Sequence, residues 1–128
     1  MRDMKSNIAA VVAIAPEVLT GNKTGGAIDL ADCNRMAFVI ATGAIAGAGS
    51  FTAKVQESDT AAGGGFADAP ARYVDDGADG ALEADAAYRI GYHGHKRYVR
   101  LVLTKASGTS IAASAVAVMG DLAETPAA

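Results

Sequence analysis

Apolar and polar side chains alternate along two segments of this chain, which is the pattern of half-buried β-strands. In 51–58, Phe, Ala and Val alternate with Thr, Lys and Gln. In 97–104, Arg97, Val99, Leu101 and Leu103 are expected on one face of a strand and the remaining residues on the other. We therefore expect each of these strands to turn one side to a core.

The segment 35–42 is apolar at almost every position and is the strongest candidate for a core strand. Met36, Phe38 and Ile40 are expected on one face, with Ala37, Val39 and Ala41 on the other. A strand that is apolar on both sides is typical of one that is covered on both sides. We therefore expect both faces of this segment to be buried.

Turn residues separate the remaining strands. An N-terminal strand is expected to end near Ala15, because Pro16 follows it. Further strands are expected at 27–30, 88–92 and 111–119. Glycine-rich or polar turns are expected at 20–26, 32–34, 43–50 and 106–109.

Residues 59–87 are rich in Gly, Ala and Asp and predict a long irregular loop, which Phe66 and Tyr73 are expected to anchor. With about seven short strands and no convincing helix, the pattern predicts an all-β protein. The expected architecture is an antiparallel β-sandwich, with a jelly roll as one open form. The whole chain, 1–128, is expected to be one domain, with 1–7 as an extended arm and 121–128 as an extended tail.

Composition narrows the functional classes. Much of the 51% hydrophobic content is alanine, so the core is expected to be thin and to gain from a partner subunit. A net charge of −3 disfavours direct binding of nucleic acid.

No segment has the ~18 apolar residues of a membrane helix, and Asp3 and Pro16 fit a secretion signal poorly. The single Cys33 excludes an internal disulfide, and no motif makes it a reactive thiol.

No motif assembles a catalytic or metal site. His93 and His95 lack a third ligand at a fixed spacing. The acidic run at 75–79 fails the calcium-loop pattern and is expected to be a solvated loop. Glu57 and Asp59 at a strand end have no cleft to make them an acid–base pair. We therefore expect no enzymatic activity, no cofactor and no metal.

An aromatic–basic cluster is the chemical feature that remains. Tyr and Arg are common anchors of protein–protein surfaces, and here they fall on two strands that meet at a glycine turn. Strand alternation predicts that Arg97 and Tyr98 point to opposite faces and contact two different surroundings. The candidate interface consists of Tyr92, Lys96, Arg97, Tyr98 and Arg100.

Four blocks of the chain resemble small structural proteins of tailed bacteriophages, in particular capsid decoration (cement) proteins. The blocks are Pro16, Thr24–Leu30, Phe51–Asp59 and Ile90–Arg100. The resemblance implies a β-rich module, often a homotrimer, that sits on the outer surface of the virion capsid. There it braces neighbouring subunits of the major capsid protein, after synthesis in the host cytoplasm.

Two other functions stay open on the sequence. A tail, neck or tail-terminator protein would be a structural protein that forms a ring. A carbohydrate-binding or adhesion module is compatible with a jelly roll, but the chain has no Trp and only four Tyr to stack on sugars.

Overall fold

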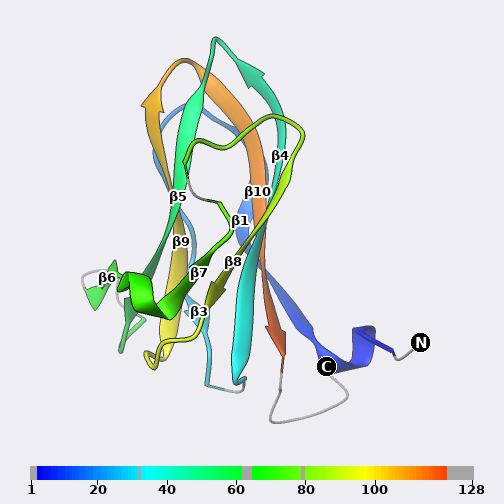
Figure 1. Ribbon diagram of the computed structural model, residues 1–128, viewed down its shortest axis with the longest axis vertical. Helices are drawn as coiled ribbons and strands as arrows, with labels where there is room; N and C mark the ends of the chain where they lie inside the picture. The colour runs from blue at the N-terminus through cyan, green and yellow to red at the C-terminus, as the bar shows by residue number, and fades with distance from the viewer. Residues whose placement is uncertain (1–2, 32, 62–64, 79, 121–128) are drawn as a thin grey trace.

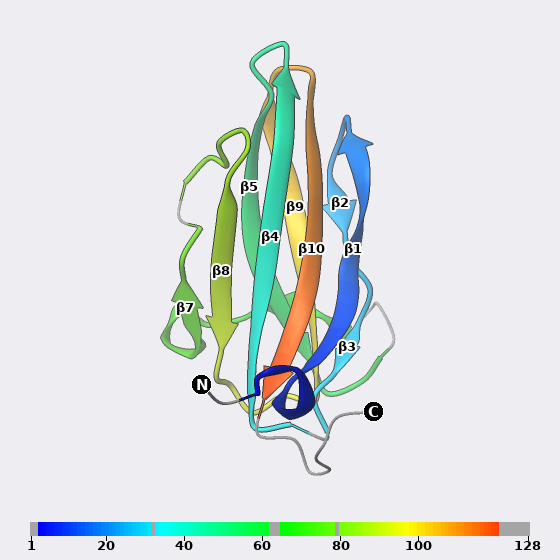
Figure 2. The ribbon, with the colours of Figure 1, turned by 90° about the vertical axis from the view of Figure 1, so that its right-hand side faces the viewer.

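Two antiparallel β-sheets pack face to face (Figures 1 and 2). The computed structural model describes residues 3–31, 33–61, 65–78 and 80–120. The first sheet has the order β1-β10-β4-β8-β7, and the second has the order β2-β9-β5-β6, with β3 also paired to β9. The elements are η1 (Lys5–Asn7), β1 (Ala9–Leu19), β2 (Lys23–Thr24), β3 (Ile28–Asp29), β4 (Arg35–Ala46), β5 (Ser50–Ser58), β6 (Ala67–Asp68), η3 (Ala71–Tyr73), β7 (Val74–Asp76), β8 (Ala87–Tyr92), β9 (Tyr98–Ser107) and β10 (Ser110–Gly120).

The strand pairing is that of a jelly roll. If β2 and β3 are taken as one interrupted strand and β7 as an addition at the sheet edge, eight strands remain. The first of these pairs with the last, β1 with β10, and the second with the seventh, β2 and β3 with β9. The third and sixth pair as β4 with β8, and the two central strands pair as β5 with β6. The predicted all-β sandwich is therefore confirmed, in its jelly-roll form.

The core lies between the sheets and is built by alternation. Met36, Phe38 and Ile40 of β4 point inward, and the inward positions of β5 and β9 face them from the other sheet. The six side chains predicted to share one core all belong to a single buried cluster. They are Phe38, Ile40, Phe51, Val55, Val99 and Leu101.

The first strand is longer than the sequence predicts. β1 continues past Ala15 and Pro16 to Leu19, in register with β10. Its ladder is irregular between Val12 and Ile14 and again between Ile14 and Glu17. Because β1 is an edge strand, a proline beside such an irregularity costs the sheet little. The expected end at Ala15 is therefore wrong.

Two expected loops also contain structure. β4 runs to Ala46 and a tight turn leads into β5 of the other sheet, so the connection expected at 43–50 is only a short turn between the two sheets. Gly47 and Ala48 take positive φ in this turn. Within 59–87, β6, η3 and β7 are ordered pieces, and Ala78 and Leu82 reach the core. Asp75 and Asp76 lie in β7 and not in a loop, although both are exposed to solvent as expected.

The outward side of β4 is not covered as expected. Ala37 and Val39 are only partly buried and Ala41 is exposed, so the prediction that both faces are buried fails for the single chain. The N-terminal arm is not fully extended either, since Lys5–Asn7 forms a 3-10 turn in which Lys5 and Asn7 donate hydrogen bonds to Asp3. The predicted tail at 121–128 lies outside the described residues. No helix among the described residues is long and apolar enough to cross a membrane.

We predict that Phe38→Ala lowers the free energy of unfolding by about 3–5 kcal/mol, because the ring is 0% exposed and its loss leaves a cavity. Thr52→Ala, on the exposed side of β5, is the control and should change stability by less than about 0.5 kcal/mol. Urea unfolding followed by far-UV circular dichroism measures both. Equal, small effects would contradict the assigned core.

Candidate functional site

The candidate interface lies at the end of the sandwich where β8 turns into β9. A hollow of about 420 Å³ opens there between the β3–β4 and β8–β9 connections. Its lining includes three members of the aromatic–basic cluster, Tyr92, Lys96 and Arg97, together with Arg35 and Cys33. The structure therefore brings most of the predicted residues to one end of the molecule.

Tyr92 is not at the surface. It is only 4% exposed, because it faces inward opposite Met36 on β4. Its hydroxyl donates to Glu57 Oε1 at 2.7 Å and accepts from the backbone N–H of Lys96 at 3.2 Å. Gly94 leaves room for this hydroxyl, since a Cβ there would collide with it. Tyr92 therefore supports the β8–β9 turn from the buried side. The prediction that Tyr92 belongs to the interface is wrong.

Lys96 and Arg97 are held by carboxylates of the same chain. Lys96 Nζ lies 2.8 Å from Asp59 Oδ2, and this hydrogen bond raises the pKa of the lysine. Arg97 binds Asp29 with two parallel hydrogen bonds, Nε to Oδ1 at 3.0 Å and Nη2 to Oδ2 at 2.9 Å. The arginine lowers the pKa of Asp29. Such fork-to-fork pairing fixes the guanidinium plane as well as its position.

The expectation that Arg97 and Tyr98 point to opposite faces is wrong. Arg97 lies just before β9, which begins at Tyr98. Its carbonyl accepts a hydrogen bond from the N–H of Leu30. Its guanidinium carbon then lies 5.1 Å from the centre of the Tyr98 ring, a cation–π distance. The two side chains therefore present one combined aromatic and cationic surface.

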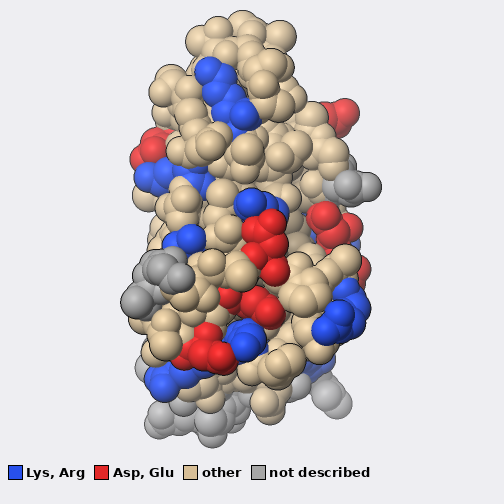
Figure 3. Space-filling model, turned by 90° about the vertical axis from the view of Figure 1, so that its left-hand side faces the viewer, with Lys and Arg blue, Asp and Glu red and all other residues tan. Residues whose placement is uncertain are grey.

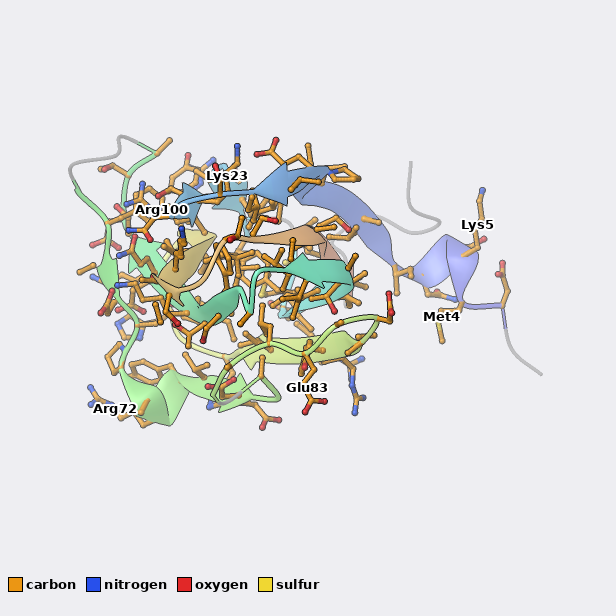
Figure 4. The ribbon with its side chains drawn as sticks, turned by 90° about the horizontal axis from the view of Figure 1, so that it is seen from above. Met4, Lys5, Lys23, Arg72, Glu83 and Arg100 are labelled. Carbon is orange, nitrogen blue, oxygen red and sulfur yellow. The ribbon has the colours of Figure 1, made fainter. Side chains whose placement is uncertain are left out.

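Arg100 lies further along β9, on the outer face of the second sheet. Its Nε donates to Gln56 Oε1 at 2.8 Å, and its guanidinium covers the Phe66 ring at 4.3 Å. Gln56 in turn donates to Asp68, which also pairs with a lysine of β5. Charged side chains gather on this face in Figure 3, and Figure 4 shows Arg100 and Arg72 on the same flank. Phe66 anchors the 59–87 segment as predicted.

The two histidines hold Tyr73, the other predicted anchor. The Tyr73 ring meets His95 edge-on at 5.4 Å and His93 at 6.4 Å between ring centres. The backbone N–H of His93 also donates to the Tyr73 carbonyl at 2.8 Å. Among the described residues, no three His, Cys, Asp or Glu side chains are grouped to bind a metal. Glu57 and Asp59 have separate partners, Tyr92 and Lys96.

A second surface was missed by the sequence reasoning, on the outer side of the first sheet. In one row across the sheet, Val12 of β1 pairs with Val116 of β10, which pairs with Val39 of β4. In another row, Val18 of β1 pairs with Ala112 of β10. We call this surface the Val/Ala face, and its members are Ala10, Val12, Val18, Ala37, Val39, Ala41, Gly43, Ala112, Ser114, Val116 and Val118.

None of these outward positions carries a charge, and Val12 and Val18 are 60% and 65% exposed. The outward positions of β5 on the other sheet are instead Thr52, Lys54 and Gln56. The sequence contained one signal for this face, because the positions of 35–42 that point away from the core are also apolar. In the structure these positions are not fully buried. The full width of the face became visible only when the register placed β1 and β10 beside them.

No protein-family model and no curated protein matches this chain. Among solved structures, a chain of the structure of infectious bursal disease virus Gx strain aligns with a TM-score of 0.52 and 10% identity, over 87% of this chain and 32% of that one. This protein therefore spans about a third of the viral chain it matches. The crystal structure of PirA aligns with 15% identity over 94% of this chain and 98% of PirA. Its TM-score of 0.39 is too low to show a shared fold. At such identities the viral likeness shows a shared fold.

We predict a stability loss at high pH that depends on Tyr92. Burial, with the hydrogen bond to Glu57, raises the pKa of Tyr92 to about 12. The folded state thus binds this proton more tightly than the unfolded state, whose pKa is near 10. The contribution is complete below pH 10 and is lost as the pH rises toward 12. Urea unfolding at successive pH values should show this component in the parent and not in Tyr92→Phe; parallel curves for the two would contradict it.

We also predict that the fold needs no metal, because His93 and His95 pack on Tyr73. Thermal unfolding should keep its midpoint after treatment with EDTA. Elemental analysis of the purified protein should find no metal at one equivalent per chain. A stoichiometric metal whose removal unfolds the protein would overturn this expectation.

Proposed function

We propose that this protein is a virion structural protein, with no catalytic role, that decorates a phage capsid and stabilises it by binding between subunits of the major capsid protein. The surface that contacts the shell is the part of the aromatic–basic cluster that reaches solvent: Arg97, which is exposed, and Lys96, Tyr98 and Arg100, which are partly buried. Two lines support the proposal. The chain resembles capsid decoration proteins in sequence layout, and its fold is shared with a chain of a virus structure.

The observation that carries the proposal is the pre-ordered state of this surface. Arg97 is fixed by Asp29, and Arg100 by Gln56 and the Phe66 ring. Long side chains that are already immobilised lose less conformational entropy when a partner binds. A rigid cationic and aromatic surface of this kind suits a large protein partner better than a small substrate.

We predict that Arg97→Ala and Arg100→Ala each weaken binding to purified shells of the major capsid protein by about 30-fold, the equivalent of roughly 2 kcal/mol for an interface anchor. Co-sedimentation over a range of protein concentrations measures the affinity. The control is Lys105→Ala, at the far end of β9, where the amine contacts the Thr20 carbonyl.

Circular dichroism must show that each variant is folded. If both arginine variants bind like the parent, the shell-binding surface is wrong. If the parent itself does not sediment with shells, the proposed function is wrong.

A further inference from the structure

The Val/Ala face is wide, its members carry no charge, and no described element covers it. Figure 2 looks onto it, with β4, β10 and β1 side by side and the η1 turn at its lower end. From Ala10 to Val18 it is roughly 27 Å long, and three strands make it about 10–14 Å wide, from ordinary strand dimensions. An apolar area of about 300–400 Å² is within the range of the largest patches on monomeric proteins, which are often functional.

The face divides into two halves of different shape. Val12, Val116, Val118 and Val39 project from one half. The other half is built mainly from small residues and contains a hollow of about 390 Å³. Glu17 also lines this hollow, and its carboxylate pairs with Lys23 at 3.4 Å. The hollow lies beside Gly43 and Ala112, where a Cβ on Gly43 would come within 3.3 Å of the alanine. One half therefore offers projections and the other a recess.

We propose that a second copy of this chain covers the Val/Ala face, so that the protein forms a two-fold dimer with the first sheets packed face to face. A two-fold axis in the plane of the contact and across the strands places the valines of each copy over the recess of the other. Sheets with the same twist pack about 10 Å apart at roughly −30°. The small residues of the recess suit that distance.

The surface chemistry favours this occupant. A head-to-tail contact, as in a trimer, joins two different patches of the molecule, so it would need a second apolar patch. The exposed large apolar side chains of the described residues are Met4, Val11, Val12 and Val18, and three of these four lie on β1. The outer face of the other sheet carries Lys54 and Arg100 instead. Among the described residues, no second surface of this size is apolar, so the face is its own best counterpart.

The area is compatible with a stable contact. A standard interface covers about 800 Å² on each partner, with an apolar centre and a polar rim. The Val/Ala face supplies about half of that as the centre. Arg35 at one end of β4 and Arg89 on β8 lie at its margin and belong to the rim. A partner here also completes the burial of β4 on both sides, which its sequence predicts.

The test uses the isolated protein without shells, so it is independent of the proposed function. Sedimentation velocity or light scattering, up to about 100 µM, should give the mass of two chains at the top of the range. Val12→Lys and Val116→Lys place an unpaired charge in the contact and should weaken the dimer at least tenfold. Val12 lies exposed on an edge strand, so its variant should fold even if the other does not.

The control is Thr52→Lys, which adds the same charge to the exposed side of β5 and should leave the dimer intact. Circular dichroism and urea unfolding establish that each variant is folded. A monomeric parent, a trimeric parent, or a dimer that survives both valine variants would each overturn the proposal. A dimer lost in the folded Val12→Lys variant and kept in the control would support it.

Discussion

The burial of alternate side chains between two sheets is the constraint on which the rest of this structure depends. The inward positions of β10 are mostly small, with Ala113, Ala115 and Ala117 in its central part. Most of the core volume must therefore come from the Phe and branched aliphatic side chains of β4, β5 and β9. A core of this kind holds the sheets in one register, because a slip of one residue would turn each inward side chain to the outside.

The same alternation determines what the two outer faces display. On the second sheet it presents Lys54, Gln56 and Arg100, which are linked through Asp68 into a network of charged and polar groups. On the first sheet it presents valine and alanine across three strands. A monomer that is polar on one outer face and apolar on the other is suited to assembly. Each of its two surfaces can then have a different partner. We propose that the apolar face pairs with its own copy and that the aromatic–basic cluster contacts the shell.

The sequence predicted the fold class well, because alternation is a local property. The core residues Phe38, Phe51 and Leu101 could be found from it directly. Pairing between distant strands is not local, and the jelly-roll order therefore stayed one option among sandwiches. The course of β1 past Pro16 was missed for the same reason, since only its position at a sheet edge makes the proline acceptable.

The candidate site was predicted in part. The sequence placed Lys96, Arg97, Tyr98 and Arg100 near one another. It could not assign the hydrogen-bond partners of Lys96, Arg97 and Arg100, which lie 37 to 68 positions away. Tyr92 was misplaced because its burial depends on Met36 opposite and on Glu57 across the core. The Val/Ala face was invisible as a surface until the register of β1, β10 and β4 was known.

The most direct test of the account is an image reconstruction of phage particles that carry this protein. The account predicts density distributed over the outer surface of the shell, in units that each contain two sandwiches packed through their first sheets, with the β8–β9 turn toward the capsid subunits. Density confined to a ring at one vertex, or units that contact the shell through the Val/Ala face, would contradict it.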